Sequence, residues 1–306
     1  MPACTPGGAP AGSGAAALRR QAVLFDFHDQ EVPYEKAWAW QRACLAAAAG
    51  EGGPLSAALG GAGGADCVLL LQHPPTYTLG AGSTTDNVLF DLDDPPHPIY
   101  RTERGGEVTY HGPGQLVLYP ILNLGRHKQD LHWYLRSLEE VVLRALASVS
   151  GLQGERVEGL TGVWVGGAKL AAIGVRARKW VTYHGLALNV ATDLAPFGLI
   201  VPCGIEGRPV GSVESALGLR PHMTARAGDS AAAAAADAAV ATGGGGWGAE
   251  QRELMVEYRY GLLEALEEVF GLELVGARPE QLDALAAAAV AAAAGPAAPE
   301  TAAAAV

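Results

Sequence analysis

Three segments carry apolar side chains at the spacing of three to four residues that is typical of one face of a helix. The clearest covers residues 130–151, where Asp130 is a favourable N-terminal cap and Gly151 a favourable end. A second runs from about 250 to 270. A third covers 33–49 and begins at a proline, which suits the first turn of a helix. We therefore expect three long helices, each burying one face.

Shorter apolar runs between turn residues predict β-strands. They cover residues 22–27, 66–75 (ending in two prolines), 115–124, 162–165, 169–178 and 183–190. The last three follow one another closely, the first two across a Gly-Gly turn, so an antiparallel arrangement is the simplest. Strands mixed with a few long helices, without a repeated strand–helix–strand unit, indicate an α+β fold. We expect a mixed or antiparallel sheet with flanking helices.

Four stretches rich in alanine and glycine flank or interrupt this pattern. Residues 1–20 form a leader, 50–65 and 223–249 are low-complexity inserts, and 284–306 are an alanine-rich tail. Such composition buries too little apolar surface to order itself, so we expect these stretches to be unstructured or, in the tail, at most a frayed helix. A single domain over residues 21–283 then holds the core.

The formal net charge is −11, which argues against a nucleic-acid partner. The charge is uneven, because residues 101–182 hold eleven Lys and Arg against seven Asp and Glu, or +4. This favours a local basic patch for an acidic partner, the alternative being charges scattered over several faces. No apolar run reaches the eighteen or so residues of a membrane-spanning helix, so no membrane partner is expected.

The four cysteines form no C-x-x-C pair and no regular spacing. This favours a reducing compartment and argues against a disulfide framework or a zinc site. Cys44 and Cys67 lie in apolar segments typical of a core, whereas Cys203 lies between Pro202 and Gly204. Proline fixes the backbone and glycine lets another group come close, so we expect this thiol at a turn within reach of a reagent.

Lys169 is the only charged residue among the thirteen of "VWVGGAKLAAIGV", residues 163–175. One interpretation is a half-buried lysine that extends to solvent or pairs with a carboxylate. The other is a desolvated ammonium that favours the thiolate of a neighbouring Cys203. His111 and His184 are rival bases for that thiol, and the sequence alone does not rank the three partners.

The segment "RTERGGEVTYHGPGQLVLYP", residues 101–120, is the densest cluster of glycine and polar residues. Its glycines free the backbone to bend around a ligand, while Arg104, Thr109, Tyr110 and His111 supply polar contacts. It is not a phosphate loop, because the chain lacks the G-x-x-x-x-G-K-[ST] pattern. No G-x-G-x-x-G lies between a strand and a helix either, so ATP and NAD binding have no direct support.

Four segments resemble, in order and spacing, the hallmark segments of the lipoyl(octanoyl) transferase family: "RGGEVTYHGPGQLVLYPILNL", "TGVWVGGAKLAAIGV", "YHGLALNV" and "LAPFGLIVPCGI". The likeness covers about residues 22–218, and "VPYEKAWAWQ" and "DLHWYLRSLEEVV" look most like the plant plastid branch. The resemblance implies the fold of the biotin/lipoate protein ligase catalytic domain. It also implies transfer of an octanoyl group from octanoyl-acyl carrier protein to a lysine of a lipoyl domain.

The same resemblance assigns the acyl-thioester nucleophile to Cys203 and its activating partner to Lys169. It maps substrate contacts onto three segments: Arg104, Gly105, Gly106, Glu107, Val108, Thr109, Tyr110 and His111; Ala172, Ile173 and Gly174; and Gly185, Leu186 and Ala187. Backbone N–H groups near Cys203 are expected to hold the oxyanion. A thioester intermediate needs no nucleotide, so no cofactor and no metal is expected.

The implied acceptors are the lipoyl domains of 2-oxoacid dehydrogenases or the H protein of glycine cleavage. The basic region 101–182 would suit an acidic carrier protein as donor. The leader has no acidic residue, two arginines and many small residues, which is typical of a transit peptide. The other interpretation of the leader is a start with no targeting role. Together with the likeness to the plant plastid branch, a transit peptide implies a plastid location, with a mitochondrion as the alternative.

Three other functions stay open. An ATP-dependent lipoate–protein ligase shares the fold and uses a lysine, but it needs a nucleotide site and no cysteine. A cysteine-dependent acyl thioesterase would form the same acyl-enzyme and pass the acyl group to water. A non-catalytic module that binds lipoyl domains would keep the groove and tolerate the loss of Cys203.

Overall fold

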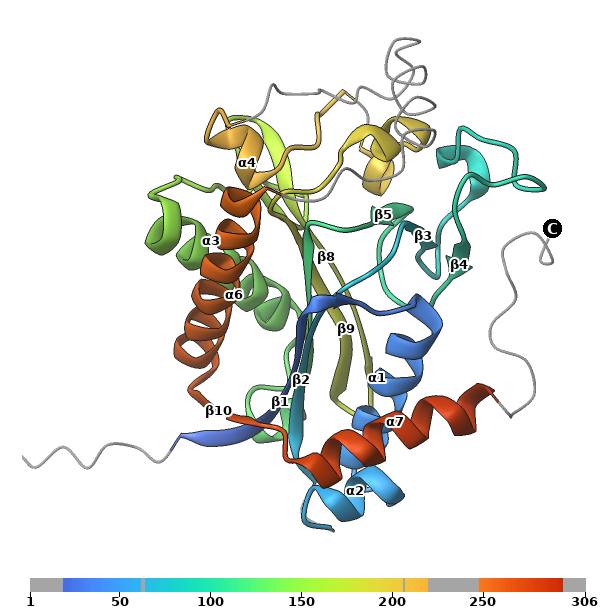
Figure 1. Cartoon of the computed structure of the whole chain (residues 1–306), viewed down its shortest axis with the longest axis vertical. Coiled ribbons are helices and arrows are strands. Elements are labelled where there is room, and N and C mark those ends of the chain that lie inside the picture. The colour runs from blue at the N-terminus through green and yellow to red at the C-terminus, as the bar shows by residue number, and fades with distance from the viewer. Residues whose placement is uncertain (1–18, 62–63, 206, 220–247, 294–306) are drawn as a thin grey trace, which may run out of the picture.

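The computed structural model describes residues 19–61, 64–205, 207–219 and 248–293. Its central layer is a seven-stranded sheet with the order β10-β1-β2-β6-β9-β8-β7 (Figure 1). The strands are β1 (Arg20–Glu31), β2 (Asp66–Gln72), β6 (Gln115–Ile121), β7 (Val163–Val165), β8 (Ala168–Arg178), β9 (Val181–Asn189) and β10 (Leu272–Gly276). β1 pairs in parallel with β2 and β10, and the other neighbours are antiparallel. The mixed sheet and the α+β class are confirmed.

Helices cover both faces of this sheet (Figure 1). α3 (Leu131–Ser150) and α6 (Ala249–Phe270) pack together, and α3 lies against β7, β8 and β9. α1 (Tyr34–Ala48) packs on β2, β6 and β9, and it contacts α2 (Pro54–Ala58) and α7 (Pro279–Ala293). α4 (Val213–Ala216) is a single turn. The three predicted helices are present within one or two residues of their expected bounds.

The ends of α3 follow from the residues predicted to cap it. The Asp130 carboxylate accepts a hydrogen bond of 2.9 Å from the backbone N–H of Trp133. Gly151 ends the helix with φ of 66°, in the left-handed region that glycine adopts without strain.

A second, three-stranded sheet lies beside the end of the main one at which β2 finishes and β6 begins, in the order β4-β3-β5 (Figure 1). Its strands are β3 (Thr76–Leu79), β4 (Ile99–Arg101) and β5 (Thr109–His111). A separate apolar cluster containing Tyr77, Val108, Tyr110 and Phe197 supports it. The sequence did not predict this sheet, because strands of three or four residues are too short to establish a period.

Two expectations about the low-complexity stretches need correction. Residues 50–65 contain α2, whose Leu55 is buried against α1 and the sheet. The tail was expected to begin at 284, but α7 continues to Ala293 and buries Leu285 in the core. Alanine favours helix, and a single leucine on the correct face anchors this helix to the domain. Most of the leader, nearly all of insert 223–249 and the end of the tail fall outside the described residues.

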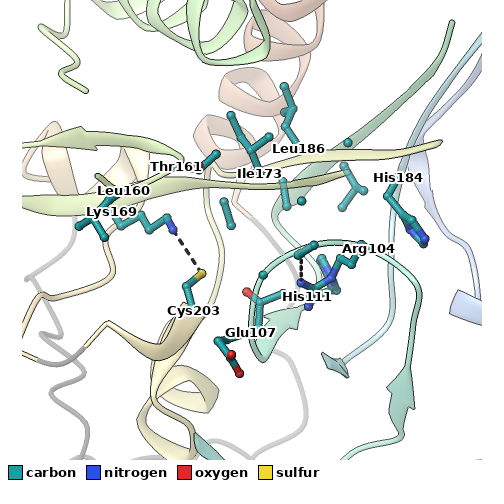
Figure 2. A pocket seen from close by; sticks show the side chains of 18 of the residues that line it. Arg104, Glu107, His111, Leu160, Thr161, Lys169, Ile173, His184, Leu186 and Cys203 are labelled. Atoms are coloured by element: carbon teal, nitrogen blue, oxygen red, sulfur yellow. Dashed lines mark hydrogen bonds between the residues drawn. The ribbon is translucent and has the colours of Figure 1, made fainter. Parts of the chain in front are cut away.

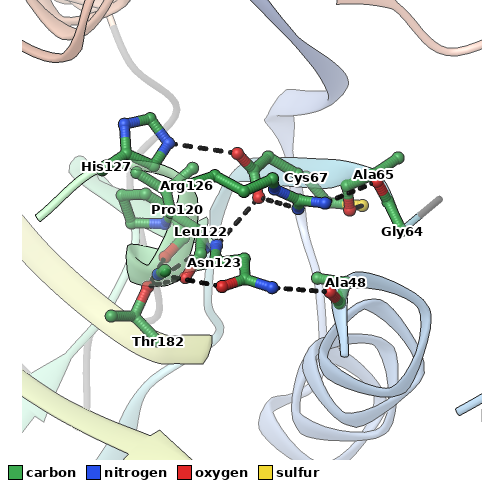
Figure 3. A network of polar contacts seen from close by, with 12 residues as sticks. Ala48, Gly64, Ala65, Cys67, Pro120, Leu122, Asn123, Arg126, His127 and Thr182 are labelled. Atoms are coloured by element: carbon green, nitrogen blue, oxygen red, sulfur yellow. Dashed lines mark hydrogen bonds and ion pairs between the residues drawn. The ribbon is translucent and has the colours of Figure 1, made fainter. Parts of the chain in front are cut away.

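A buried carboxylate joins the start of β2 to the turn η2 (Leu124–Arg126) after β6 (Figure 3). Asp66 accepts hydrogen bonds from the backbone N–H of Asn123 at 2.8 Å, from Arg126 at 2.6 Å and from His127 at 3.1 Å. Burial acts to raise the pKa of Asp66, but the bonds from His127 and Asn123 and the charge of Arg126 outweigh it. The pKa therefore lies below its usual 3.8.

Candidate active site

Cys203 lies at the centre of η4 (Pro202–Gly204), a single tight turn. Its backbone adopts φ 58° and ψ 18°, the left-handed conformation that few residues other than glycine adopt. A hydrogen bond of 2.9 Å from its N–H to the carbonyl of Val108 holds this geometry. The turn leaves the side chain only partly buried, as expected from the flanking proline and glycine.

The other two cysteines in the described ranges are core residues, as predicted. Cys44 and Cys67 have no exposed surface. The neighbouring Cys44 thiol and burial together hold the pKa of Cys67 well above its ordinary value, so this thiol stays protonated and unreactive.

Lys169 is the second residue of β8, and only 7% of it is exposed. Its backbone bonds to the segment that follows the cysteine turn, donating to Pro209 O at 2.9 Å and accepting from Gly211 N at 3.0 Å. Gly162 makes room for the side chain, because a Cβ there would lie 2.6 Å from Lys169 Cε. The fold therefore directs this lysine inward.

The Lys169 ammonium donates a hydrogen bond of 3.2 Å to the Cys203 thiol sulfur (Figure 2). The ammonium also lies 5.1 Å from the centre of the buried Trp164 ring, a cation–π distance. A positive charge in an enclosed site stabilises the thiolate, which is the nucleophilic form of cysteine. Of the two interpretations of Lys169, the structure matches the desolvated ammonium beside a thiol.

A cavity of about 240 Å³ opens beside this pair. It is lined by Lys169, Cys203 and residues of the three predicted segments: Arg104, Gly105, Gly106, Glu107, Thr109, His111, Ala172, Ile173, Gly174, Gly185, Leu186 and Ala187. Figure 2 shows Arg104 and Glu107 across from the strands β8 and β9, on the same side of these strands as Cys203. A cavity with partly apolar walls and a nucleophile at one side is suited to an acyl thioester.

Val108 and Tyr110 are the two expected substrate contacts that do not line the cavity. Both point to the opposite side of their segment and are buried in the apolar cluster beneath the small sheet. Alternation along an extended chain explains this, because neighbouring side chains point to opposite sides. Sequence reasoning missed Val117, Tyr119, Gly159, Leu160, Thr161 and Ile205, which also line the cavity.

Two glycines are required where β8 and β9 form the cavity wall. A Cβ at Gly185 would lie 2.1 Å from the carbonyl oxygen of Leu118, and one at Gly174 would lie 2.8 Å from that of Gly105. The loop at Gly105 docks onto β8 by donating its N–H to Val175 O at 3.0 Å. The close approach at Gly174 lets the backbone of residues 104–106 pack directly on β8, and the one at Gly185 lets β9 lie close to β6.

The two histidines considered as bases for Cys203 line the cavity, but burial disfavours the charged form of both, and His111 is held by other hydrogen bonds. His111 shares hydrogen bonds with Gln115 at 2.7 Å and Thr78 at 3.3 Å, and burial holds its pKa well below the ordinary value. His184 is also buried, which lowers its pKa, and its nearest charged group is Glu103 at 3.7 Å. In the described part of the chain, the hydrogen bond at the Cys203 sulfur comes from Lys169.

The backbone N–H groups near Cys203, which were expected to bind the oxyanion, already donate hydrogen bonds within the protein. The N–H groups of Cys203, Gly204 and Ile205 donate to the carbonyls of Val108, Val201 and Pro202. A developing oxyanion would therefore depend on other groups of the cavity, and its two buried cations are Lys169 and Arg104.

No cluster of three or more His, Cys, Asp or Glu side chains that could hold a metal ion occurs within the described ranges. Among those same residues, no helix is both long and apolar enough to span a membrane.

Comparison with known proteins places this site in a family. Residues 33–234 match the model of the lipoyl protein ligase A/B catalytic domain. The chain is 54% identical over 201 residues to octanoyltransferase LIP2p2, chloroplastic, of Arabidopsis thaliana, covering 65% of this chain and 69% of that protein. It is 45% identical over 244 residues to an octanoyltransferase of Nostoc sp., covering 80% and 90%.

Solved structures agree on the fold. A lipoate–protein ligase A bound with ATP superimposes with a TM-score of 0.57 at 14% identity, covering 91% of this chain and 97% of that one. The putative lipoate protein ligase Ta0514 of T. acidophilum, with bound lipoic acid, gives 0.55 at 14%, covering 88% and 93%. The chain therefore belongs to the lipoyl protein ligase A/B catalytic-domain family and, within it, to the octanoyltransferases.

Proposed function

We propose that this octanoyltransferase takes its acyl group from octanoyl-acyl carrier protein and holds it as a thioester on Cys203 before passing it to a lipoyl-domain lysine. The observation that carries the proposal is the 3.2 Å hydrogen bond from the Lys169 ammonium to the Cys203 sulfur at the wall of the cavity. A lysine paired with a reactive thiol provides both a nucleophile and a proton donor.

In the first half-reaction the Cys203 thiolate attacks the carbonyl carbon of the donor thioester. A new C–S bond forms, the C–S bond to the carrier breaks, and the leaving thiolate takes a proton from the Lys169 ammonium. One thioester is exchanged for another, so the free-energy change is small and no nucleotide is needed.

In the second half-reaction the ammonium of the acceptor lysine gives a proton to the Lys169 amine. The resulting neutral amine attacks the acyl carbon, a C–N bond forms, and Cys203 leaves as the thiolate. The second proton of the attacking nitrogen passes to solvent. The products are an amide on the acceptor and the starting enzyme with Lys169 charged again, and conversion of thioester to amide is downhill.

The cavity walls support an acyl chain as cargo. Val117, Ala187 and Ala172 are register partners across β6, β9 and β8, and their small apolar side chains leave space on one face of the sheet that larger side chains would fill. Burying methylene groups against such walls contributes roughly 0.8 kcal/mol per group, which favours a medium-length chain over a short one.

The proposed acceptors are lipoyl domains of 2-oxoacid dehydrogenases or the H protein of glycine cleavage, and the proposed location is a plastid. The location is supported by the chloroplastic Arabidopsis relative and by the composition of the leader. Expression of the full chain with a C-terminal fluorescent tag tests it, and a signal over mitochondria would support the alternative.

Mass spectrometry of the intact protein after incubation with octanoyl-acyl carrier protein tests the chemistry. The wild type should gain one octanoyl group, mapped to the peptide with Cys203, and lose it when a lipoyl domain is added. Loss of the adduct to water alone at the same rate would indicate a thioesterase. Acceptor modification that requires ATP and free octanoate would indicate a ligase, and no adduct would overturn the proposal.

A further inference from the structure

Arg104 is a buried cation whose hydrogen-bond partners are all neutral. Its guanidinium donates to the Thr78 carbonyl at 2.7 Å, to the Thr78 hydroxyl at 2.9 Å and to the carbonyl of Gly105 at 3.0 Å. It is 8% exposed and lines the cavity (Figure 2). In the part of the chain that the structure describes, no carboxylate pairs with it. A guanidinium stays protonated at neutral pH even when burial lowers its pKa.

Lys169 is a second buried cation in the same cavity. Its ammonium contacts the Cys203 sulfur and the Trp164 ring, and it too has no carboxylate partner within the described ranges. Two enclosed positive charges are costly to hold without negative charge nearby.

The side chains around these cations leave few sources of that negative charge. The titratable and charged neighbours are Cys203, Glu103, Glu107, Tyr34, Tyr119, His73, His111 and His184. Burial raises the pKa of both tyrosines and lowers that of all three histidines, so all five are neutral. Glu103 is half exposed and faces His184.

Glu107 is at the rim, half-buried, and accepts a hydrogen bond from Asn87 at 3.3 Å. Its carboxylate points away from the lysine–cysteine pair (Figure 2). Among these groups, Cys203 is the one that bonds directly to one of the two cations, through the Lys169 ammonium, and acylation would leave its sulfur without a charge.

We infer that Arg104 is a positioning residue whose fixed charge drives Lys169 to its neutral form once Cys203 is acylated. The inference rests on the proposed thioester. Acylation removes the negative charge that the Cys203 sulfur can carry beside Lys169, while Arg104 keeps its positive charge. The Arg104 guanidinium stays protonated, so it is Lys169 that loses its proton. The leaving thiolate of the carrier protein accepts that proton. Lys169 then stays neutral and accepts the proton of the incoming acceptor ammonium.

Single-turnover deacylation measured against pH tests this role. Octanoylated wild type, Arg104→Gln and Arg104→Lys are mixed with lipoyl domain between pH 6 and 9.5, and the Cys203 adduct is followed by mass spectrometry. Without the fixed charge Lys169 keeps its proton to higher pH. The profile of Arg104→Gln should therefore move up by about one pH unit, making deacylation about tenfold slower near pH 7. Arg104→Lys should restore most of the wild-type profile.

A matched variant distinguishes an effect of the Arg104 charge from an effect of the contacts that hold its side chain. Thr78→Val removes the hydroxyl that binds Arg104 but keeps the guanidinium, so its rate is expected to fall without a shift of the profile. Superimposable profiles for Arg104→Gln and wild type would overturn the inference while leaving the thioester in place. Absence of any Cys203 adduct in the wild type would overturn the proposed function and this inference together.

A measurement on the wild type covers the case in which Arg104→Gln does not fold. Alkylation of Cys203 with iodoacetamide removes the thiolate charge as acylation does. The ¹⁵N resonance of the Lys169 side chain should then report a neutral amine near pH 8, while the untreated enzyme reports an ammonium. A lysine that stays charged up to pH 9.5 after alkylation would contradict the inference.

Discussion

The backbone N–H of Cys203 donates a 2.9 Å hydrogen bond to the carbonyl of Val108. Val108 is fully buried and belongs to the segment that contributes Arg104, Glu107 and the loop glycines to the cavity. One bond therefore fixes the distance between the nucleophile turn and the substrate-binding segment, and it holds the cysteine in its left-handed conformation. Strained backbone at a reactive residue persists when surrounding structure determines it.

Cys203→Ser is expected to reduce octanoyl transfer by at least about a thousandfold while leaving the fold intact, because a hydroxyl is not activated by a neighbouring ammonium. Transfer is measured as octanoylation of a lipoyl domain, with circular dichroism as the folding control. Cys44→Ala and Cys67→Ala are the matched controls, which should lose about 1–2 kcal/mol of stability and keep activity. Substantial transfer by the serine variant would exclude Cys203 as the nucleophile.

Lys169→Met keeps the length of the side chain and removes its charge. Iodoacetamide should alkylate Cys203 about tenfold more slowly near pH 7 in this variant, because the thiolate loses its stabilising cation. Acyl transfer should fall further than alkylation, since the second half-reaction also needs a base for the incoming amine. The readout is alkylation rate against pH. Identical curves for variant and wild type would move the activating role to His111 or His184.

Ala172→Leu should shorten the acyl site, because Ala172 lines the cavity where β8 pairs with Ala187 of β9. We expect kcat/KM for octanoyl thioesters to fall about 10–100-fold, with butanoyl thioesters much less affected. Ala177→Leu, on the same strand but outside the cavity lining, is the control and should behave like wild type. Equal losses for both chain lengths would show that the chain does not occupy this space.

Arg176→Glu tests the basic patch expected in the central region. Arg176 is exposed on β8, next to the Val175 carbonyl that anchors the Gly105 loop. Charge reversal should slow transfer from the acidic carrier protein and weaken its dependence on salt, with little effect on a small octanoyl thioester. Arg278→Glu, directly before α7 and exposed on a different part of the surface, is the control. Equal losses with both donors would point to a folding defect.

The hydrogen bonds of Asp66 predict how the stability of the folded protein changes in acid. Its folded-state pKa lies below the usual 3.8, so its contribution is fully present above that value and is lost as pH falls through the folded-state pKa. Asp66→Asn should cost about 2–4 kcal/mol at pH 7 and flatten the loss of stability as the pH falls below the usual 3.8. Urea unfolding at several pH values measures this, with exposed Asp94→Asn as the control. A parallel acid response in both variants would contradict the role given to Asp66.

Much of the architecture could be predicted because long elements repeat their pattern many times. The helix over 130–151 has a cap at each end and several turns of apolar spacing, and the hairpin of β8 and β9 has two long strands across a short turn. The small sheet could not be predicted, since β4 and β5 each have three residues. The length of the helix α7 could not be predicted, because Leu285 becomes buried only when α7 packs against α1 and the sheet.

The sequence by itself determined which residues carry unusual chemistry. A cysteine between proline and glycine, a lone lysine in an apolar strand and a glycine-rich polar segment all stand out without any coordinates. Only the tertiary structure decided that Lys169, and not His111 or His184, bonds to the Cys203 sulfur, across 34 residues of chain. Such pairing depends on sheet register and on where a glycine leaves room, which are properties of packing between distant segments. For the same reason, only the fold revealed that Lys169 and Arg104, two buried cations, line one cavity.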